Sequence, residues 1–188
     1  MAYFPIYIDM KDLKVLLVGG GKIAAEKLAK LLDFTQAITV ISIAVDENVK
    51  ELVDTHSLSL HIRAYLPRDI QGFDIVIIAT DNTELHKAIY QESRESNILV
   101  NSVDNQTYCD FIFPSYVQKG DLTIAFSTAG ASPAFAKRIR QYFENTIPDS
   151  VGGFLEKMKD LRSTMPKGRE RMKYFETLVE RYFSQHFK

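Results

Sequence analysis

The sequence predicts an α/β protein whose core is a doubly wound parallel sheet, followed by a smaller α+β region and a helical region. Short apolar runs alternate with amphipathic helical segments up to Asp104, the pattern of strand–helix–strand units. The three glycines from Gly19 to Gly21 directly follow the first apolar run. Beyond Asp104 the alternation stops and a hairpin pattern begins.

Five strands are predicted in the first part of the chain, at residues 14–18, 38–41, 58–62, 75–79 and 98–101. The fourth is continuously apolar, as is typical of a strand buried on both faces. A helix is predicted from Ile23, since Ala24, Leu28, Leu31 and Leu32 share one face. A second helix is predicted over residues 83–96.

The second part of the chain predicts a hairpin and three helices. Residues 116–118 and the alternating run 122–126 flank the turn 119–121. Ser132 and Pro133 form a strong helix start, and that helix is expected to end near Asn145. Two further helices, at 151–164 and 169–187, flank the breaker 166–168. Such a pair buries little surface alone, so we expect it to pack on the rest of the chain or on a second subunit.

Composition limits the class of protein. A formal net charge of -1 argues against binding to nucleic acid or to an anionic membrane surface through overall charge. The apolar runs are too short to span a bilayer, and the N-terminus lacks the pattern of a signal peptide. Cys109 is the single cysteine, and the four histidines form no ligand motif. We therefore expect a cytoplasmic protein with no metal site, no nucleic-acid partner and no membrane partner.

The glycine triplet carries the first functional signal. Gly19-x-Gly21-x-x-Ala24 follows a predicted strand and opens a predicted helix, which is the context of a dinucleotide-binding fingerprint. The loop predicts a Rossmann-type fold that holds a pyrophosphate on the helix N-terminus. The alternative is a glycine turn that binds no ligand. The candidate cofactor-binding residues here are Gly19, Gly20, Gly21, Lys22 and Ile23.

Other candidate residues lie where the strands end. The second strand ends at Ser42 and Ile43 without the acidic residue that usually bonds the NAD ribose, and no arginine nearby marks a 2′-phosphate. From these residues NAD and NADP both remain open, and Ser42 and the backbone around Ile43 are the candidates to bond the ribose instead. Polar residues also end the fourth and fifth strands, and ligands bind at that edge of an open α/β sheet: Thr80, Asp81, Asn101 and Asp104. Capping of the helix that starts at Thr83, by Asp81 or Asn82, and a capping or turn role for Asp104 are the alternatives.

Five stretches of the chain together resemble one family, that of precorrin-2 dehydrogenase, which includes the N-terminal module of siroheme synthase. These stretches are Phe4 to Tyr7, Val18 to Ala24, Ile78 to Asp81, Asn101 to Asp104, and Phe113 to Ser115 continuing to Ser127 to Pro133. The glycine loop is generic, whereas the last two stretches at this spacing are specific. The resemblance spans nearly the whole chain.

The resemblance implies NAD-dependent oxidation of precorrin-2 to sirohydrochlorin, and in some members the insertion of ferrous iron. It implies a homodimer with an NAD-binding domain at 1–113, a dimerisation region at 114–147 and a helical region at 148–188. The important aspartate of the family falls on Asp104, and a functional serine falls on Thr128, which keeps the hydroxyl. The missing acid of the second strand is normal for the family, which favours NAD.

The substrate of the family is a macrocycle that carries many carboxylates. The resemblance therefore suggests that the second half of the chain binds these carboxylates. A helix N-terminus and basic side chains on its first turns suit such anions. The candidate substrate-binding residues are Thr128, Ser132, Lys137 and Arg140. The alternative is an ordinary solvated basic helix face. Asp104 is the candidate catalytic residue, because a carboxylate near the macrocycle can stabilise developing positive charge and accept a proton.

Two other classes of protein share part of the pattern. An NAD-binding regulatory module of a potassium transport system has a similar glycine loop, but it leaves the stretch 113–133 unexplained. A Rossmann dehydrogenase of another small molecule is the second alternative. Turnover of precorrin-2 with NAD discriminates among the three.

Overall fold

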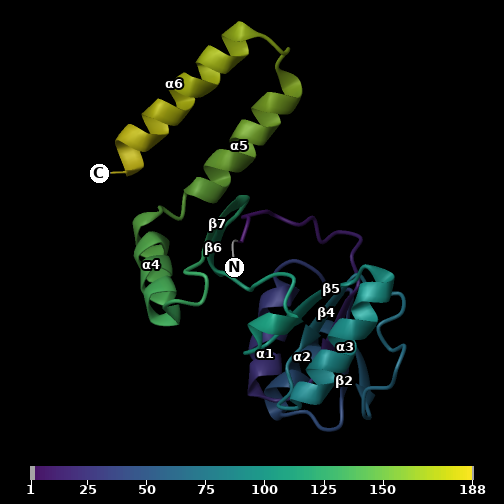
Figure 1. The fold of residues 1–188 in the computed structure, drawn as a ribbon. Helices are drawn as coiled ribbons and strands as arrows, with labels where there is room; N and C mark the ends of the chain where they lie inside the picture. The colour runs from purple at the N-terminus through teal and green to yellow at the C-terminus, as the bar shows by residue number, and fades with distance from the viewer. Residues whose placement is uncertain (1–2, 188) are drawn as a thin grey trace. The chain divides into compact units, whose positions relative to one another are not determined.

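The computed structural model of the chain describes residues 3–187 and divides into two compact units. The first unit runs from Tyr3 to Phe113, and the second begins at Pro114 and contains the remaining helices (Figure 1).

The first unit is a five-stranded parallel sheet in the order β3-β2-β1-β4-β5. Its strands are β1 (Val15–Val18), β2 (Ile38–Ser42), β3 (Ser59–Ile62), β4 (Ile75–Ile78) and β5 (Leu99–Ser102). Its helices are α1 (Lys22–Leu32), α2 (Glu47–His56) and α3 (Thr83–Ser96), with a short 3-10 turn over Gln106–Tyr108. This strand order confirms the predicted Rossmann-type fold.

Two apolar layers cover the sheet, one on each face. On one face Val15 and Leu17 of β1 pack with α1 and α2. On the other face Leu16 and Val18 pack with α3 and with Ile70. Because successive side chains of a strand point to opposite faces, the central strands are apolar throughout, as their sequence predicts.

Helix α2 is not among the elements that the sequence analysis predicts. Asp46 caps it, since its Oδ1 accepts the Val49 amide at 2.9 Å. Its apolar face is short: Val49 and Val53 are buried, and Leu52 is half-buried. The link from β3 to β4 has no helix, and instead the irregular segment 63–74 places the fully buried Ile70 against the sheet.

The second unit pairs an antiparallel hairpin with three helices. The hairpin consists of β6 (Ser115–Lys119) and β7 (Leu122–Phe126), and the helices are α4 (Pro133–Thr146), α5 (Val151–Thr164) and α6 (Arg169–His186). Ser132 caps α4 by accepting the Phe135 amide at 3.2 Å, and Pro133 occupies the first turn. The hairpin and all three helices are thus confirmed.

The core of the second unit joins the hairpin to the C-terminal helices. Val117 of β6 packs with Ile147, with Val151 of α5 and with Tyr182 of α6. Helices α5 and α6 therefore pack on the hairpin of their own chain. This was one of the two arrangements expected for them from the sequence. Among residues 3–187 no helix is both long and apolar enough to cross a membrane.

Candidate functional site

The turn after β1 requires glycine at its first position. Gly19 has φ +129°, and a Cβ there would stand 2.1 Å from the Ala79 carbonyl oxygen. The Gly19 amide donates to the Ile41 carbonyl at 2.9 Å, which fixes the turn against β2. Only glycine allows this close approach of the two backbones.

The next two glycines differ sharply in their surroundings. A Cβ on Gly20 would lie 2.2 Å from the Ala44 carbonyl oxygen, so Gly20 is required by packing. Gly21 has nothing within 4 Å of the Cβ position, and its φ of -87° is open to any residue. It precedes α1, where no side chain caps the helix and where Lys22 and Ile23 are exposed. The fold alone does not require glycine at this position, whereas close approach of a pyrophosphate to this helix start would require it.

At the end of β2, the side chain of Ser42 is buried and the apolar side chain of Ile43 is exposed to solvent. Ser42 is buried, and its hydroxyl donates to the Ala44 carbonyl at 2.7 Å. Its oxygen keeps its acceptor capacity. Ile43 is 76% exposed, which suits a residue that lies against a bound group.

A buried histidine that the sequence analysis does not assign links the ends of β4 and β5. His86 of α3 is 3% exposed; its Nδ1 lies 2.5 Å from Ser102 Oγ, and its Nε2 lies 2.8 Å from the Thr80 carbonyl oxygen. A carbonyl only accepts, so Nε2 donates and Nδ1 accepts the Ser102 hydroxyl. The signal in the sequence is helical spacing, since His86 shares the buried face of α3 with Ile89 and Ser93.

Thr80 and Asp81, two of the predicted cofactor-binding residues, follow β4. Thr80 is half-buried, and its hydroxyl accepts the Asn82 amide at 3.3 Å. The cap of α3 is Asn82, whose Oδ1 accepts the Leu85 amide at 3.1 Å. Of the two capping residues considered, Asn82 is therefore the cap, and Asp81 is exposed.

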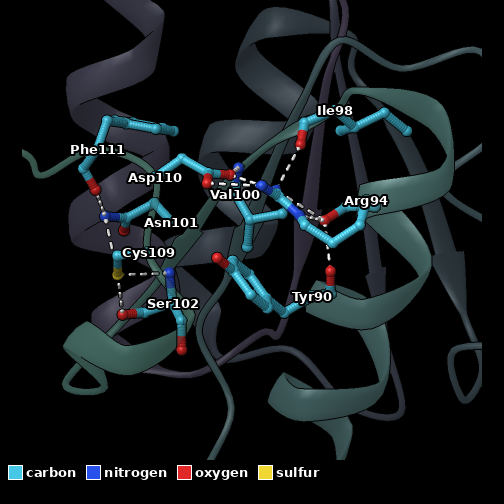
Figure 2. Close-up of polar contacts among 10 residues, drawn as sticks. Tyr90, Arg94, Ile98, Val100, Asn101, Ser102, Cys109, Asp110 and Phe111 are labelled. Atoms are coloured by element: carbon cyan, nitrogen blue, oxygen red, sulfur yellow. Dashed lines mark hydrogen bonds and ion pairs between the residues drawn. The ribbon is translucent and has the colours of Figure 1, made fainter.

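The segment after β5 folds back along the edge strand and covers it (Figure 2). Asp110 bonds Val100 twice, through its own amide at 2.8 Å and through a carboxylate oxygen that accepts the Val100 amide at 2.8 Å. Arg94 holds that carboxylate through both terminal nitrogens, which raises the pKa of the guanidinium. The Cys109 thiol donates to the Ser102 carbonyl at 3.0 Å, and burial raises its pKa.

Asn101 belongs to this same structural arrangement. It is 5% exposed, and its side-chain amide donates to the Phe111 carbonyl at 2.8 Å (Figure 2). The amide nitrogen therefore ties the returning segment to β5. A role of Asn101 in cofactor binding stays a prediction.

Asp104 stands exposed just past the end of β5, at φ +59°. Aspartate and asparagine tolerate this left-handed conformation better than most residues. Lys27 of α1 is a charged neighbour: burial, and then the charge of Lys30, lower its pKa, while Asp104 raises it. The Lys27 ammonium lies 4.4 Å from the centre of the Phe113 ring.

The predicted substrate residues all lie in the second unit. Thr128 Oγ1 accepts the Ser132 amide at 3.1 Å, so this hydroxyl shapes the loop before α4. Lys137 is exposed on α4, and Arg140 pairs with Glu144 at 2.5 Å one turn later. Arg138, Arg140 and Tyr142 line part of an open hollow on this helix. Within residues 3–187, no three His, Cys, Asp or Glu side chains are arranged to hold a metal ion.

The strand order, the glycine turn and the open start of α1 define a dinucleotide-binding protein of the Rossmann class. Comparison with known families agrees. The chain belongs to the family described as putative NAD(P)-binding, whose model matches residues 6–115. A second model, described as sirohaem biosynthesis protein central, matches residues 119–146.

Similar proteins cover both units. A siroheme synthase of Methylococcus capsulatus is 36% identical over 184 residues, which is 96% of this chain and 39% of that protein. A siroheme synthase of Pseudoalteromonas atlantica is 39% identical over 85% of this chain and 35% of its own length. The chain thus spans well under half the length of these relatives.

A solved structure described as SirC, precorrin-2 dehydrogenase, matches with a TM-score of 0.79 and 25% identity. The match covers 95% of this chain and 88% of that one. The resemblance to the N-terminal module of siroheme synthase is therefore confirmed.

Proposed function

We propose that this chain oxidises precorrin-2 to sirohydrochlorin with NAD as hydride acceptor, in the biosynthesis of siroheme. The observation that carries the proposal is the match to the SirC structure, which extends over both units of the chain. The alternative function, an NAD-binding module of a transporter, would involve only the first unit. It does not explain why residues 119–146 match the model described as sirohaem biosynthesis protein central.

Turnover is the direct test. Purified protein mixed with precorrin-2 and NAD is expected to form NADH and sirohydrochlorin in equal amounts, both followed by absorbance. NADH formation with another small alcohol or acid, and none with precorrin-2, would instead identify a dehydrogenase of a different substrate. Binding of NAD without turnover of any substrate would favour the regulatory module.

The cofactor is proposed to lie along the carboxyl ends of the strands. Gly19 and Gly20 form the turn, and the amides at Gly21, Lys22 and Ile23 would hold the pyrophosphate. When bound, NAD would supply the nicotinamide that accepts the hydride. Further along this edge the proposed contacts are made by Ser42, Ile43, Thr80, Asp81 and Asn101. The open space at Gly21 supports this placement, because it leaves room for a phosphate against the backbone.

The chemistry asked of the protein is modest. Oxidation of precorrin-2 removes a hydride and a proton, so the chain must orient the macrocycle and accept the proton. Asp104 is the proposed acceptor: it is an exposed carboxylate at the end of β5, on the sheet edge where ligands bind. Its negative charge also stabilises positive charge that develops on the macrocycle as the hydride leaves.

The carboxylates of the substrate are proposed to contact the start of α4. The first amides of a helix carry partial positive charge, and Lys137 adds a full one. Thr128 and Ser132 use their hydroxyl oxygens as acceptors in the loop, and each keeps a proton to donate to a carboxylate. Arg140 contributes charge after its partner Glu144 is displaced or shared.

We further predict a homodimer formed through the second unit. Large apolar side chains remain exposed on α4 and α6, with Phe135 62% and Met172 63% exposed. Analytical ultracentrifugation at micromolar concentration is expected to give a dimer, and Phe135→Glu is expected to weaken it. Phe4→Glu makes the same change in the first unit and serves as the control. A monomeric wild-type protein would contradict this prediction.

The sequence-based expectation of a cytoplasmic location stays a prediction, as does the insertion of ferrous iron.

A further inference from the structure

The arginine that follows β3 lies beside the end of β2. The Arg63 amide donates to the Ser42 carbonyl at 2.9 Å, so the two residues are neighbours across the strand pair. In dinucleotide-binding folds the end of β2 faces the adenosine ribose, whose 2′ substituent distinguishes NAD from NADP. Here β2 ends without an acidic residue, so no carboxylate of that strand can accept a hydrogen bond from the 2′-hydroxyl.

Arg63 is held by a carboxylate of the following loop. Its two terminal nitrogens bond the two oxygens of Asp69, at 2.5 Å and 2.9 Å. Asp69 also accepts the Leu66 amide at 2.7 Å, and Arg63 also donates to the Ala64 carbonyl at 3.0 Å. Both groups of this Arg63–Asp69 pair are therefore fixed by bonds to their own loop.

The charges of the pair are stable at neutral pH. The hydrogen bond to Asp69 raises the pKa of Arg63, and the same bond lowers the pKa of Asp69. The arginine side chain is nevertheless 38% exposed, and that of Asp69 is 15% exposed. A group bound at the end of β2 thus lies next to a residue whose guanidinium charge Asp69 already matches.

We propose that the Arg63–Asp69 pair sets the choice of cofactor, so that NAD binds and the 2′-phosphate of NADP is rejected. A phosphate binds arginine through the same paired N–H groups that Asp69 occupies. It would also bring negative charge next to the Asp69 carboxylate, which repels it. The neutral 2′-hydroxyl of NAD meets neither obstacle, and a carboxylate oxygen of Asp69 can accept a hydrogen bond from it in place of the missing acid.

The inference uses only NAD(P) binding, so its test needs no turnover. NADH and NADPH are titrated separately, and their fluorescence gives the two dissociation constants. The wild-type protein is expected to bind NADH more tightly. Asp69→Asn keeps an acceptor for the Leu66 amide, removes the competing charge, and is expected to improve NADPH binding relative to NADH by about tenfold.

A second variant moves the ratio in the opposite direction. Arg63→Met leaves Asp69 without its cation, so NADPH is expected to bind still less well relative to NADH than it does to the wild type. Asp149→Asn removes an ion pair with Lys119 in the second unit and is expected to leave the ratio unchanged. Melting temperatures establish that each variant is folded.

The proposal is overturned if the wild-type protein prefers NADPH, or if the ratio in Arg63→Met equals that of the wild type. An unchanged ratio in folded Asp69→Asn overturns it as well, and should that variant unfold, Arg63→Met decides alone. A protein that shows these ratios but fails to oxidise precorrin-2 would contradict the proposed activity and leave the pair's role intact.

Discussion

Asp104→Asn is expected to lower the rate of precorrin-2 oxidation by about 10²-fold or more, the usual scale for loss of a general acid or base. Asparagine matches aspartate in size and in much of its hydrogen bonding, but it carries no charge and cannot take up a proton. The substitution suits the backbone here, because asparagine also tolerates the left-handed φ of +59° at this position. A large loss of rate in this variant therefore reports the chemistry of the carboxylate.

Two measurements separate catalysis from structure. NAD affinity by calorimetry and the melting temperature are both expected to stay near their wild-type values, because Asp104 is exposed. Asp54→Asn, an exposed carboxylate on α2, is the matched control and is expected to retain full activity. Near wild-type turnover in folded Asp104→Asn would show that Asp104 is a turn residue and that the protein only positions the two reactants.

The same variant tests whether the chain also inserts iron. Wild-type protein is first assayed for siroheme formation from sirohydrochlorin and ferrous iron. If that activity is present and falls together with oxidation in Asp104→Asn, the two reactions share one site. If it survives, the two reactions use separate groups.

Local patterns were sufficient to predict most of the fold. The strands, the glycine turn and the start of α4 each depend on a few adjacent residues, and the structure has them where the sequence places them. Helix α2 was missed because its buried face consists of little more than Val49 and Val53, too short a pattern to stand out beside the strands. Its Asp46 cap, followed by apolar residues at helical spacing, was the available signal.

Contacts between distant residues were not predictable from such patterns. His86 joins Thr80 to Ser102, and nothing in the local sequence distinguishes it from a surface histidine except its place on the apolar face of α3. Arg63 reaches the end of β2 only because β3 pairs with that strand. Contacts of this kind, between residues on neighbouring strands, can be identified only when the order of the strands in the sheet is known.

Gly21→Asp is expected to abolish measurable NAD binding while leaving the protein folded. The wild-type backbone conformation at Gly21 is open to any residue, and nothing lies within 4 Å of the Cβ position. The side chain therefore costs the fold little, and an aspartate before the first turn of a helix is often favourable. It would, however, place both volume and negative charge where the pyrophosphate must approach the helix start.

The neighbouring glycines make this prediction specific. Gly19→Ala and Gly20→Ala would each drive a Cβ to about 2 Å from a backbone carbonyl oxygen, so both are expected to lose stability as well as cofactor binding. Gly153→Asp, also in open space but in the second unit, controls for the added charge. Calorimetry with NAD and thermal melts on all four variants give the comparison. Unchanged NAD affinity in folded Gly21→Asp would mean that this loop is a structural turn, and that the cofactor must be held elsewhere on the sheet edge.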